Sequence, residues 1–285
     1  MTLVRRLVAD PLALAGAALV AVFLAVAVGA GWLAPADPYT RYPALTRDLH
    51  PGAIPGPRPG FPLGADGLGR DLASRMLYGT RESLLIGVCA TLAGLGVGAL
   101  LGGLAGGLGG PVDALLMRVV DVLLAIPGLL LAITVAALVD RPTRWVVIAA
   151  VGICAVPVFA RLLRGTILAA RAAPYLAALH AVGIRRRTIL RRHLVPHVLP
   201  PLLVQATLTF PLTIIDAAGL SFLGLGDQDP NRAEWGAMLG EAQRYLDVRP
   251  ALLLWPATGI ILLALGFTLL GEGLRAALHP RDGHP

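Results

Sequence analysis

The strongest constraint on this chain is a set of six long apolar stretches separated by polar segments. A bilayer core about 30 Å thick requires roughly 20 apolar residues in an α-helix. Charged residues make up only 14% of the chain, against about 25% in an ordinary soluble domain. We therefore expect an all-α polytopic protein of the cell (inner or plasma) membrane with six transmembrane helices, at residues 12–34, 83–108, 115–139, 145–159, 198–223 and 251–270.

Several local patterns refine these spans. The first apolar run has about 23 residues, which exceeds the 7–15 residues of a signal-peptide core, so we expect a retained anchor. Residues 68–84 predict a short amphipathic helix that enters the second span. Pro127 is expected to kink the third span.

Glycines recur at every fourth position of the second span. In lipid, such a stripe lets two helices approach closely. We therefore expect a helix-packing face, with a loosely packed or flexible helix as the alternative; its residues are Gly94, Gly98, Gly102 and Gly106.

The arginines indicate the orientation of the chain. All 24 basic residues are Arg, and the segment 161–197 holds eight of them with no Asp or Glu. The positive-inside rule makes this segment cytoplasmic, and six spans then place both termini in the cytoplasm. The segments predicted outside (35–82, 140–144 and 224–250) hold 11 Arg and 11 acidic residues, so the net charge of +7 lies elsewhere. The charge therefore marks topology, and we expect the lipid bilayer and no nucleic acid as a partner.

A few ionisable residues lie within the predicted spans. Arg118 and Asp121 lie near the start of the third span, where a functional pair and simple snorkelling to the interface are both open. Asp216 is the one acid near the middle of a span. A structural hydrogen-bonding role and a place along a solute path are both open for it.

The sequence lacks the patterns of an intramembrane enzyme. It has no His-Glu-x-x-His zinc motif and no Gly-x-Ser-x-Gly nucleophile turn. Without lysine it cannot contain the Gly-x-x-x-x-Gly-Lys-Ser/Thr phosphate loop. We expect no catalytic residue, no metal site and no cofactor in this chain.

The basic segment 161–197 has an internal pattern. A run with few helix breakers reaches His180, Gly183 favours a chain reversal, and a second basic stretch begins at Arg185. A helix–Gly–helix unit of this kind could dock into a partner's groove or lie on anionic lipid. The pattern alone leaves both open.

This segment resembles the cytoplasmic loop of ABC importer permeases, whose pattern is EAA, three residues, Gly, nine residues, then Ile-x-Leu-Pro. Here the frame reads Ala177-Ala178-Leu179, Gly183 and His193-Leu194-Val195-Pro196. Further stretches are similar to motifs of the same family, namely LGADGLGRD with SRMLYG (63–79), LSFLGLG (220–226), WGAML (235–239) and GEGLRAALHP (271–280). Together with the anchor they cover nearly the whole chain and resemble the C-type permease subunit of the dipeptide/oligopeptide/nickel importers.

The resemblance implies a type I ABC importer permease fold and a set of partners. A homologous permease would complete a heterodimeric translocation path, two ABC ATPase subunits or domains would supply ATP and Mg²⁺, and an extracytoplasmic binding protein would deliver the solute. The expected cargo is a dipeptide or oligopeptide. A nickel or other metal-chelate importer on the same scaffold is the alternative, and a non-transport membrane anchor is a more distant one.

The resemblance also implies which residues couple this chain to the ATPase. They are Tyr175, Ala177, Ala178, Gly183 and Pro196. Ala177 replaces the Glu of the pattern, which removes an anionic contact, and our hypothesis is that Arg185, Arg186 and Arg187 compensate. The expected domains are an anchor with an extracytoplasmic segment (1–80), the transmembrane domain (81–275, with the coupling loop 161–197) and a cytoplasmic tail (276–285).

Overall fold

The structure, a computed structural model, describes residues 7–46, 53–174, 184, 188, 192, 194–229 and 231–278. Five helices are long and apolar enough to cross a membrane: α2 (Pro11–Leu33), α4 (Leu72–Leu108), α7 (Arg144–Arg171), α10 (Val195–Leu220, continued by the π-helix η2, Ser221–Leu225) and α12 (Ala251–Leu278). A bent pair, α5 (Gly110–Ala125) and α6 (Gly128–Ala137), makes a sixth span when it is counted as one. The predicted all-α membrane fold is confirmed.

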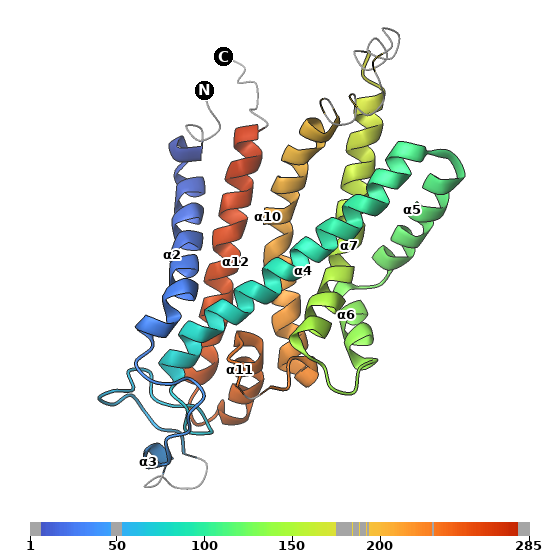
Figure 1. Cartoon of the computed structure of the whole chain (residues 1–285). Coiled ribbons are helices and arrows are strands. Elements are labelled where there is room, and N and C mark those ends of the chain that lie inside the picture. The colour runs from blue at the N-terminus through green and yellow to red at the C-terminus, as the bar shows by residue number, and fades with distance from the viewer. Residues whose placement is uncertain are drawn as a thin grey trace.

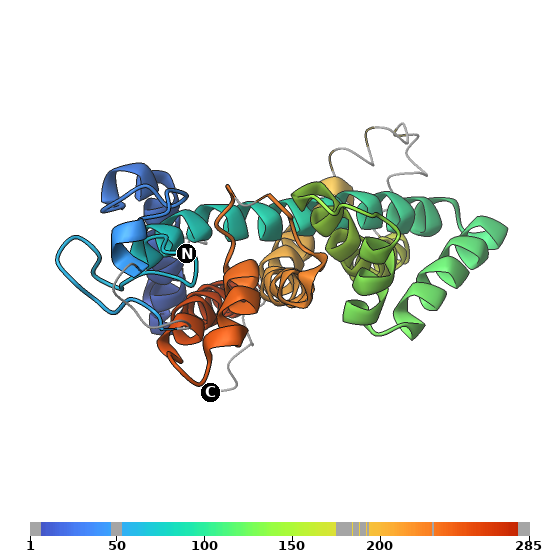
Figure 2. The same cartoon turned by 90° about the horizontal axis from the view of Figure 1, so that it is seen from below.

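The helices stand in an elongated row. Figures 1 and 2 show α2 and α12 at one end of this row and α5 and α6 at the other. The long α4 crosses the row obliquely and contacts α2, α10 and α7. The short α3 (Pro43–Thr46), α11 (Trp235–Ala242) and η3 (Gln243–Tyr245) lie at the lower end in Figure 1.

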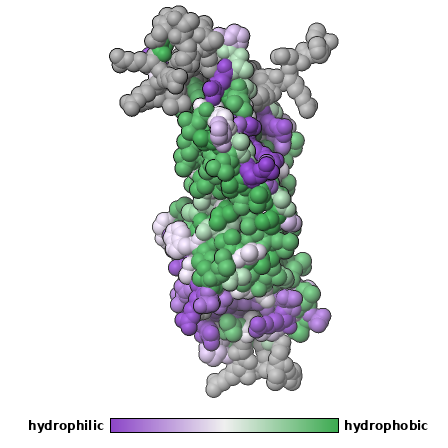
Figure 3. Space-filling model, turned by 90° about the vertical axis from the view of Figure 1, so that its right-hand side faces the viewer, coloured by the Kyte–Doolittle hydropathy of each residue, from purple (hydrophilic) through white to green (hydrophobic). Residues whose placement is uncertain are grey.

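Chain ends and connections fall on two sides of the row. The start of α2, the ends of α4, α7 and α12 and the start of α10 share one side, which we call the terminal side (Figure 1). The end of α2 and the starts of α4, α7 and α12 lie on the opposite side. Between them, a broad hydrophobic band faces outward and gives way to hydrophilic residues toward both ends (Figure 3). This is the surface that a bilayer-spanning bundle requires.

The second span is longer than predicted. α4 is one continuous helix of 37 residues, in which most of the amphipathic helix expected at 68–84 runs directly into the second span. The helix begins at Leu72 and not at residue 68, because the carboxylate of Asp71 caps it by accepting the Ser74 amide at 2.7 Å. Residues before it are held in turns because Asp66 accepts the amides of Leu68 and Arg70 at 2.9 and 3.0 Å.

The fourth span also extends beyond its predicted end at residue 159. α7 continues to Arg171, so Arg161, Arg164 and Arg171 are helical and not loop residues. Arginine, leucine and alanine favour helix and make up most of these turns, with Gly165 and Thr166 as the weaker helix formers, which explains why the helix continues past its apolar part.

The third span is broken at the proline that predicted a kink. α5 and α6 meet at an angle of 94° across Ile126 and Pro127. Proline lacks an amide donor and pushes the preceding residue to extended backbone, as seen at Ile126 (φ −94°, ψ 128°). The kink is therefore confirmed, but it is large enough to separate two helices.

α5 starts at Gly110 and not at residue 115, because Gly109 and Gly110 reverse the chain with φ of 70° and 56°.

The glycine stripe of α4 faces α7. A Cβ atom added at any of the four positions would press on an α7 residue, namely Ala155 at Gly94, Phe159 at Gly98, Ala160 at Gly102 and Ile167 at Gly106. All four glycines are buried. Their missing side chains let the two backbones come together, as in other membrane helix pairs with small residues every fourth position.

We predict that Gly102→Ala destabilises the protein and that Gly96→Ala does not. The Gly102 methyl would overlap the Ala160 carbonyl, and overpacking of this kind costs about 1–3 kcal/mol. Gly96 lies in the same helix with open space around it, so alanine there is harmless or stabilises the helix. Unfolding in mixed detergent micelles measures both variants. Equal stabilities for the two variants would contradict the packing role.

Candidate functional site

On the terminal side, arginines of α7 bind the corner between α4 and α5. The Arg164 guanidinium donates two hydrogen bonds to the Asp113 carboxylate, from Nε to Oδ1 at 2.5 Å and from Nη2 to Oδ2 at 2.7 Å. Arg161 Nη2 donates to Asp121 Oδ1 at 2.7 Å. Arg171 Nη1 donates to the carbonyls of Gly106 and Gly107 at 2.7 and 3.1 Å, where α4 ends. Three of the eight arginines expected in the coupling loop therefore have partners inside this chain.

The residues predicted to couple to an ATPase lie between α7 and α10. Pro196 is the second residue of α10, a position where its missing amide hydrogen costs no helical bond. The others fall outside the described residues: Tyr175, Ala177, Ala178, Gly183, Arg185, Arg186 and Arg187. The helix–Gly–helix interpretation of this segment stays a prediction.

The structure does not pair Arg118 with Asp121. Asp121 binds Arg161 of α7, and both side chains are more than half exposed. Arg118 is exposed and makes no ion pair within the part of the chain that the structure describes. Asp121 thus joins helices, a role that its spacing from Arg118 did not predict.

Asp216 lies at the meeting point of α10, α6 and α7. It is half-buried, and a Cβ added to Gly128 would lie 3.9 Å from its Oδ2 and from the Cβ of Cys154. The Cys154 thiol donates to the Gly128 carbonyl at 3.1 Å. Asp216 has no hydrogen-bond partner among the described residues. A polar carboxylate therefore lies beside the break between α5 and α6, within an otherwise apolar part of the bundle.

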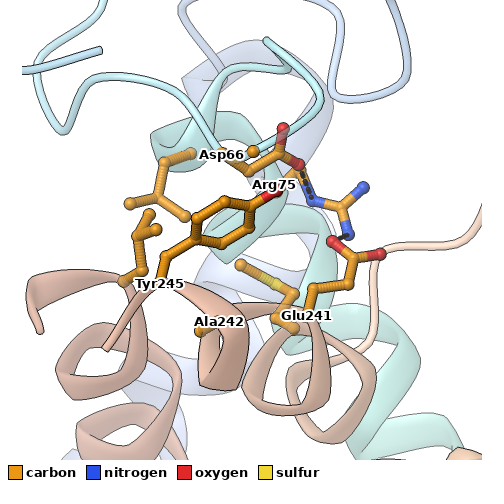
Figure 4. Close-up of a pocket in the computed structure, with 9 residues that line it drawn as sticks. Asp66, Arg75, Glu241, Ala242 and Tyr245 are labelled. Atoms are coloured by element: carbon orange, nitrogen blue, oxygen red, sulfur yellow. Dashed lines mark hydrogen bonds and ion pairs between the residues drawn. The ribbon is translucent and has the colours of Figure 1, made fainter. Parts of the chain in front are cut away.

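On the opposite side, charged residues from distant parts of the sequence form a group, which we call the Arg75 cluster (Asp66, Arg70, Arg75 and Glu241); the first three are buried and Glu241 is partly exposed. Arg70 bonds Asp66 at 2.7 Å and Glu241 at 2.6 Å. Arg75 lies 3.3 Å from both carboxylates, and its side chain is 1% exposed. Figure 4 shows its guanidinium between Asp66 and Glu241, with the ring of Tyr245 alongside. The cluster fastens α11 to the start of α4.

The cavity beside the cluster is too small for a solute. Its volume is about 20 Å³, and Leu72, Met238 and Leu252 supply its apolar wall. That volume suits roughly one water molecule. The Arg75 cluster therefore joins α11 to the start of α4 and leaves room for no more than about one water molecule beside it.

A second group of charges joins three further segments on the same side. Arg144, the first residue of α7, lies 3.3 Å from Glu82 of α4, and its amide donates to Asp227 at 3.2 Å. Arg232 lies 3.2 Å from Asp227 and 3.6 Å from Glu82. The loop that follows η2 is thus tied to α4 and α7.

Sequence reasoning missed these contacts. The segment with Arg70 and Arg75 was quoted only as a motif, and Glu241 lies 166 or more positions away with no pattern to indicate the pairing. Among the described residues, no three His, Cys, Asp or Glu side chains are grouped to hold a metal ion.

Glu234 caps the start of α11 in a buried position. Its two carboxylate oxygens accept the amides of Gly236 and Ala237 at 2.8 and 2.9 Å. Burial nevertheless raises the pKa of Glu234 above its usual value, and the backbone hydrogen bonds oppose this shift only in part.

We predict that Arg75→Met lowers the free energy of unfolding by about 3 kcal/mol, since it leaves the buried Asp66 carboxylate with one cation fewer. The matched control is Arg275→Met on α12, because the Arg275 pair with Glu272 is exposed (63% and 58%). An exposed pair contributes at most about 1 kcal/mol. Denaturant titration in detergent compares the two. The structural role is wrong if Arg75→Met loses no more stability than the control.

We also predict a pH dependence that Glu234 carries. Because its pKa is raised in the folded state, the folded protein holds this proton to a higher pH than the unfolded chain does. Its contribution is therefore fully present below the ordinary pKa of about 4.5 and is lost as the pH rises through the raised value. As the pH rises through this range, the midpoint temperature of thermal unfolding should fall more steeply for the wild type than for Glu234→Gln. Parallel curves would refute the assignment.

Comparison with known proteins places these features in a family. Residues 98–282 match the family described as "Binding-protein-dependent transport system inner membrane component". Residues 2–51 match the "N-terminal TM domain of oligopeptide transport permease C". The chain is also similar to a solved chain of the MetNI methionine ABC transporter in an inward-facing conformation, with a TM-score of 0.57, 19% identity, and coverage of 71% of this chain and 96% of that one. That likeness concerns the fold.

Similar curated proteins cover nearly the whole chain. The glutathione transport system permease protein GsiD of Pectobacterium atrosepticum is 41% identical over 97% of this chain and 89% of its own. The probable D,D-dipeptide transport system permease protein DdpC of Escherichia coli is 38% identical over 99% and 91%. The dipeptide transport system permease protein DppC of Alkalihalophilus pseudofirmus is 35% identical over 97% and 88%. The apolar helices and these matches establish that the chain belongs to the inner-membrane permeases of ABC importers, within the dipeptide/oligopeptide group.

Proposed function

We propose that this permease subunit pairs with a homologous permease to enclose a path for dipeptides, oligopeptides or small peptides such as glutathione. The observation that carries the proposal is 35–41% identity over at least 97% of the chain to permeases named for such cargo. These names include no nickel or other metal-chelate importer, so they lend that alternative no support. An extracytoplasmic binding protein would deliver the peptide.

The terminal side would be cytoplasmic. α7 ends and α10 begins on this side, and they flank the acid-free segment with eight arginines (Figure 1). The Arg75 cluster would then lie outside. This orientation agrees with the proposed division of the chain into three parts: the anchor with its outer segment (1–80), the transmembrane domain (81–275) and the cytoplasmic tail (276–285).

Two ABC ATPase subunits, which bind ATP and Mg²⁺, would dock on the segment between α7 and α10. The proposed contacts are Tyr175, Ala177, Ala178, Gly183 and Pro196. Arg185, Arg186 and Arg187 would compensate for the missing Glu at position 177. Support comes from the spacing of the family pattern and from Pro196, the second residue of α10.

Asp216 would act within the path or support it. It has no partner among the described residues and lies next to the α5–α6 break, which favours a role beyond simple packing. A carboxylate with a water-filled path or a partner subunit beside it avoids the cost of burial in hydrocarbon.

Reconstitution of the complete complex tests the proposal. The chain is co-expressed with its neighbouring permease, ATPases and binding protein, and uptake of a radiolabelled dipeptide into proteoliposomes is measured with and without ATP. We expect ATP-dependent uptake that unlabelled peptides compete and that nickel chelates leave unchanged. Competition by the chelates alone would favour the metal alternative, and an intact complex without any uptake would favour a membrane anchor.

Charge reversal tests the docking of the ATPases. Reversing the charge of Arg185, Arg186 and Arg187 should abolish co-purification of the ATPases, and an unchanged yield of complex would reject the compensation hypothesis.

Asp216→Asn separates the two roles proposed for the carboxylate. Full uptake with lower stability supports a structural role, and lost uptake with normal stability supports a role in the path.

A further inference from the structure

The helix α5 is held by unusually few apolar contacts. Of its 16 residues only Val120 is buried, and the helix stands at the end of the row (Figures 1 and 2). Both of its ends are points where the backbone changes direction, the glycine corner at Gly109 and Gly110 and the 94° break at Ile126 and Pro127. Its position therefore depends on the few side chains that bind it.

Those side chains come from the part of α7 that leads into the basic segment. Arg164 and Asp113 form a two-bond pair whose side chains are 35% and 17% exposed. Arg161 and Asp121 form a second, more exposed pair. The bidentate geometry of the first pair restricts both distance and orientation, which a single bond does not.

α7 contains a proline between this region and its contact with Gly128. Pro157 lies inside the helix, between Cys154 and Arg161. A proline removes one helical hydrogen bond and weakens the transmission of bending along the helix. The terminal half of α7 is therefore connected to the middle of the bundle along its own axis, through its packing on α4, and across the ion pairs into α5.

The connection through α5 ends at Asp216. Beyond the break, α6 contacts α7, α10 and η2. Its first residue, Gly128, lies beside Asp216 and accepts the hydrogen bond of the Cys154 thiol. A displacement of α5 along its own axis would move this point directly.

We propose that Arg164 and Asp113, assisted by Arg161 and Asp121, are positioning residues that transmit movement of the coupling segment to the surroundings of Asp216. This inference rests on the proposed function, in which ATPases move that segment. The Arg164–Asp113 pair does not touch the solute. It links α7 to α5, so that ATP hydrolysis changes the conformation around Asp216.

The experiment follows Cys154 as a reporter within the reconstituted complex. Cys89→Ala leaves Cys154 as the single thiol of this chain, and the partner subunits are made free of reactive thiols. Labelling by a membrane-permeant maleimide is timed with and without a non-hydrolysable ATP analogue. We expect the analogue to change the labelling rate at least about fivefold, as for an ordinary coupling between sites, and Arg164→Gln to abolish the change. The double variant Arg164→Asp with Asp113→Arg should restore it.

Two further measurements make the outcome decisive. Arg164→Gln should raise the ATP consumed per peptide imported, whereas Glu272→Gln, which breaks an exposed pair on α12, should leave it unchanged. The inference is overturned if Arg164→Gln keeps the nucleotide response, if the exchanged pair fails to restore it in an intact complex, or if the wild type shows none. Failure of the proposed function is distinct, because it removes ATP-dependent peptide uptake from the wild type itself.

Discussion

The close contact between α4 and α7 is the interaction on which the rest of the structure depends. Water drives no helix association within a bilayer, so helices join through backbone approach and packing. Four buried glycines give α4 that approach along its length. Because α4 also contacts α2 and α10, this oblique helix brings both ends of the row into one bundle.

Charged residues complete the bundle at its two ends. On the opposite side, the Arg75 cluster and the group around Arg144 and Glu82 hold α11 and the loop after η2 against α4 and α7. On the terminal side, arginines of α7 hold α5. Arginine serves both places well, since it stays charged and its planar head binds carboxylates with two bonds at once. The apolar centre between them contains the isolated Asp216.

Some of this arrangement was predictable from local pattern. The apolar spans, the glycine stripe and the Pro127 kink each follow from residues close together in the sequence. The predictions failed at the boundaries of the spans: α4 starts just after Asp71 because of a cap, and α7 continues to Arg171, beyond the end predicted for the fourth span. The pairs Arg164–Asp113 and Arg75–Glu241 join residues 51 and 166 positions apart, a separation for which hydropathy carries no signal.

The sequence by itself determined the membrane class, the positions of the apolar stretches and the motifs of an importer permease, because the length and polarity of each segment are enough to decide which residues can enter lipid. Only the tertiary structure decided that Arg161, Arg164 and Arg171 already bind other parts of this chain. Charge counts treat all eight arginines of the basic segment alike, whereas a salt bridge depends on where another helix places a carboxylate. That placement follows from the chain reversal at Gly109 and Gly110, which brings Asp113 alongside Arg164.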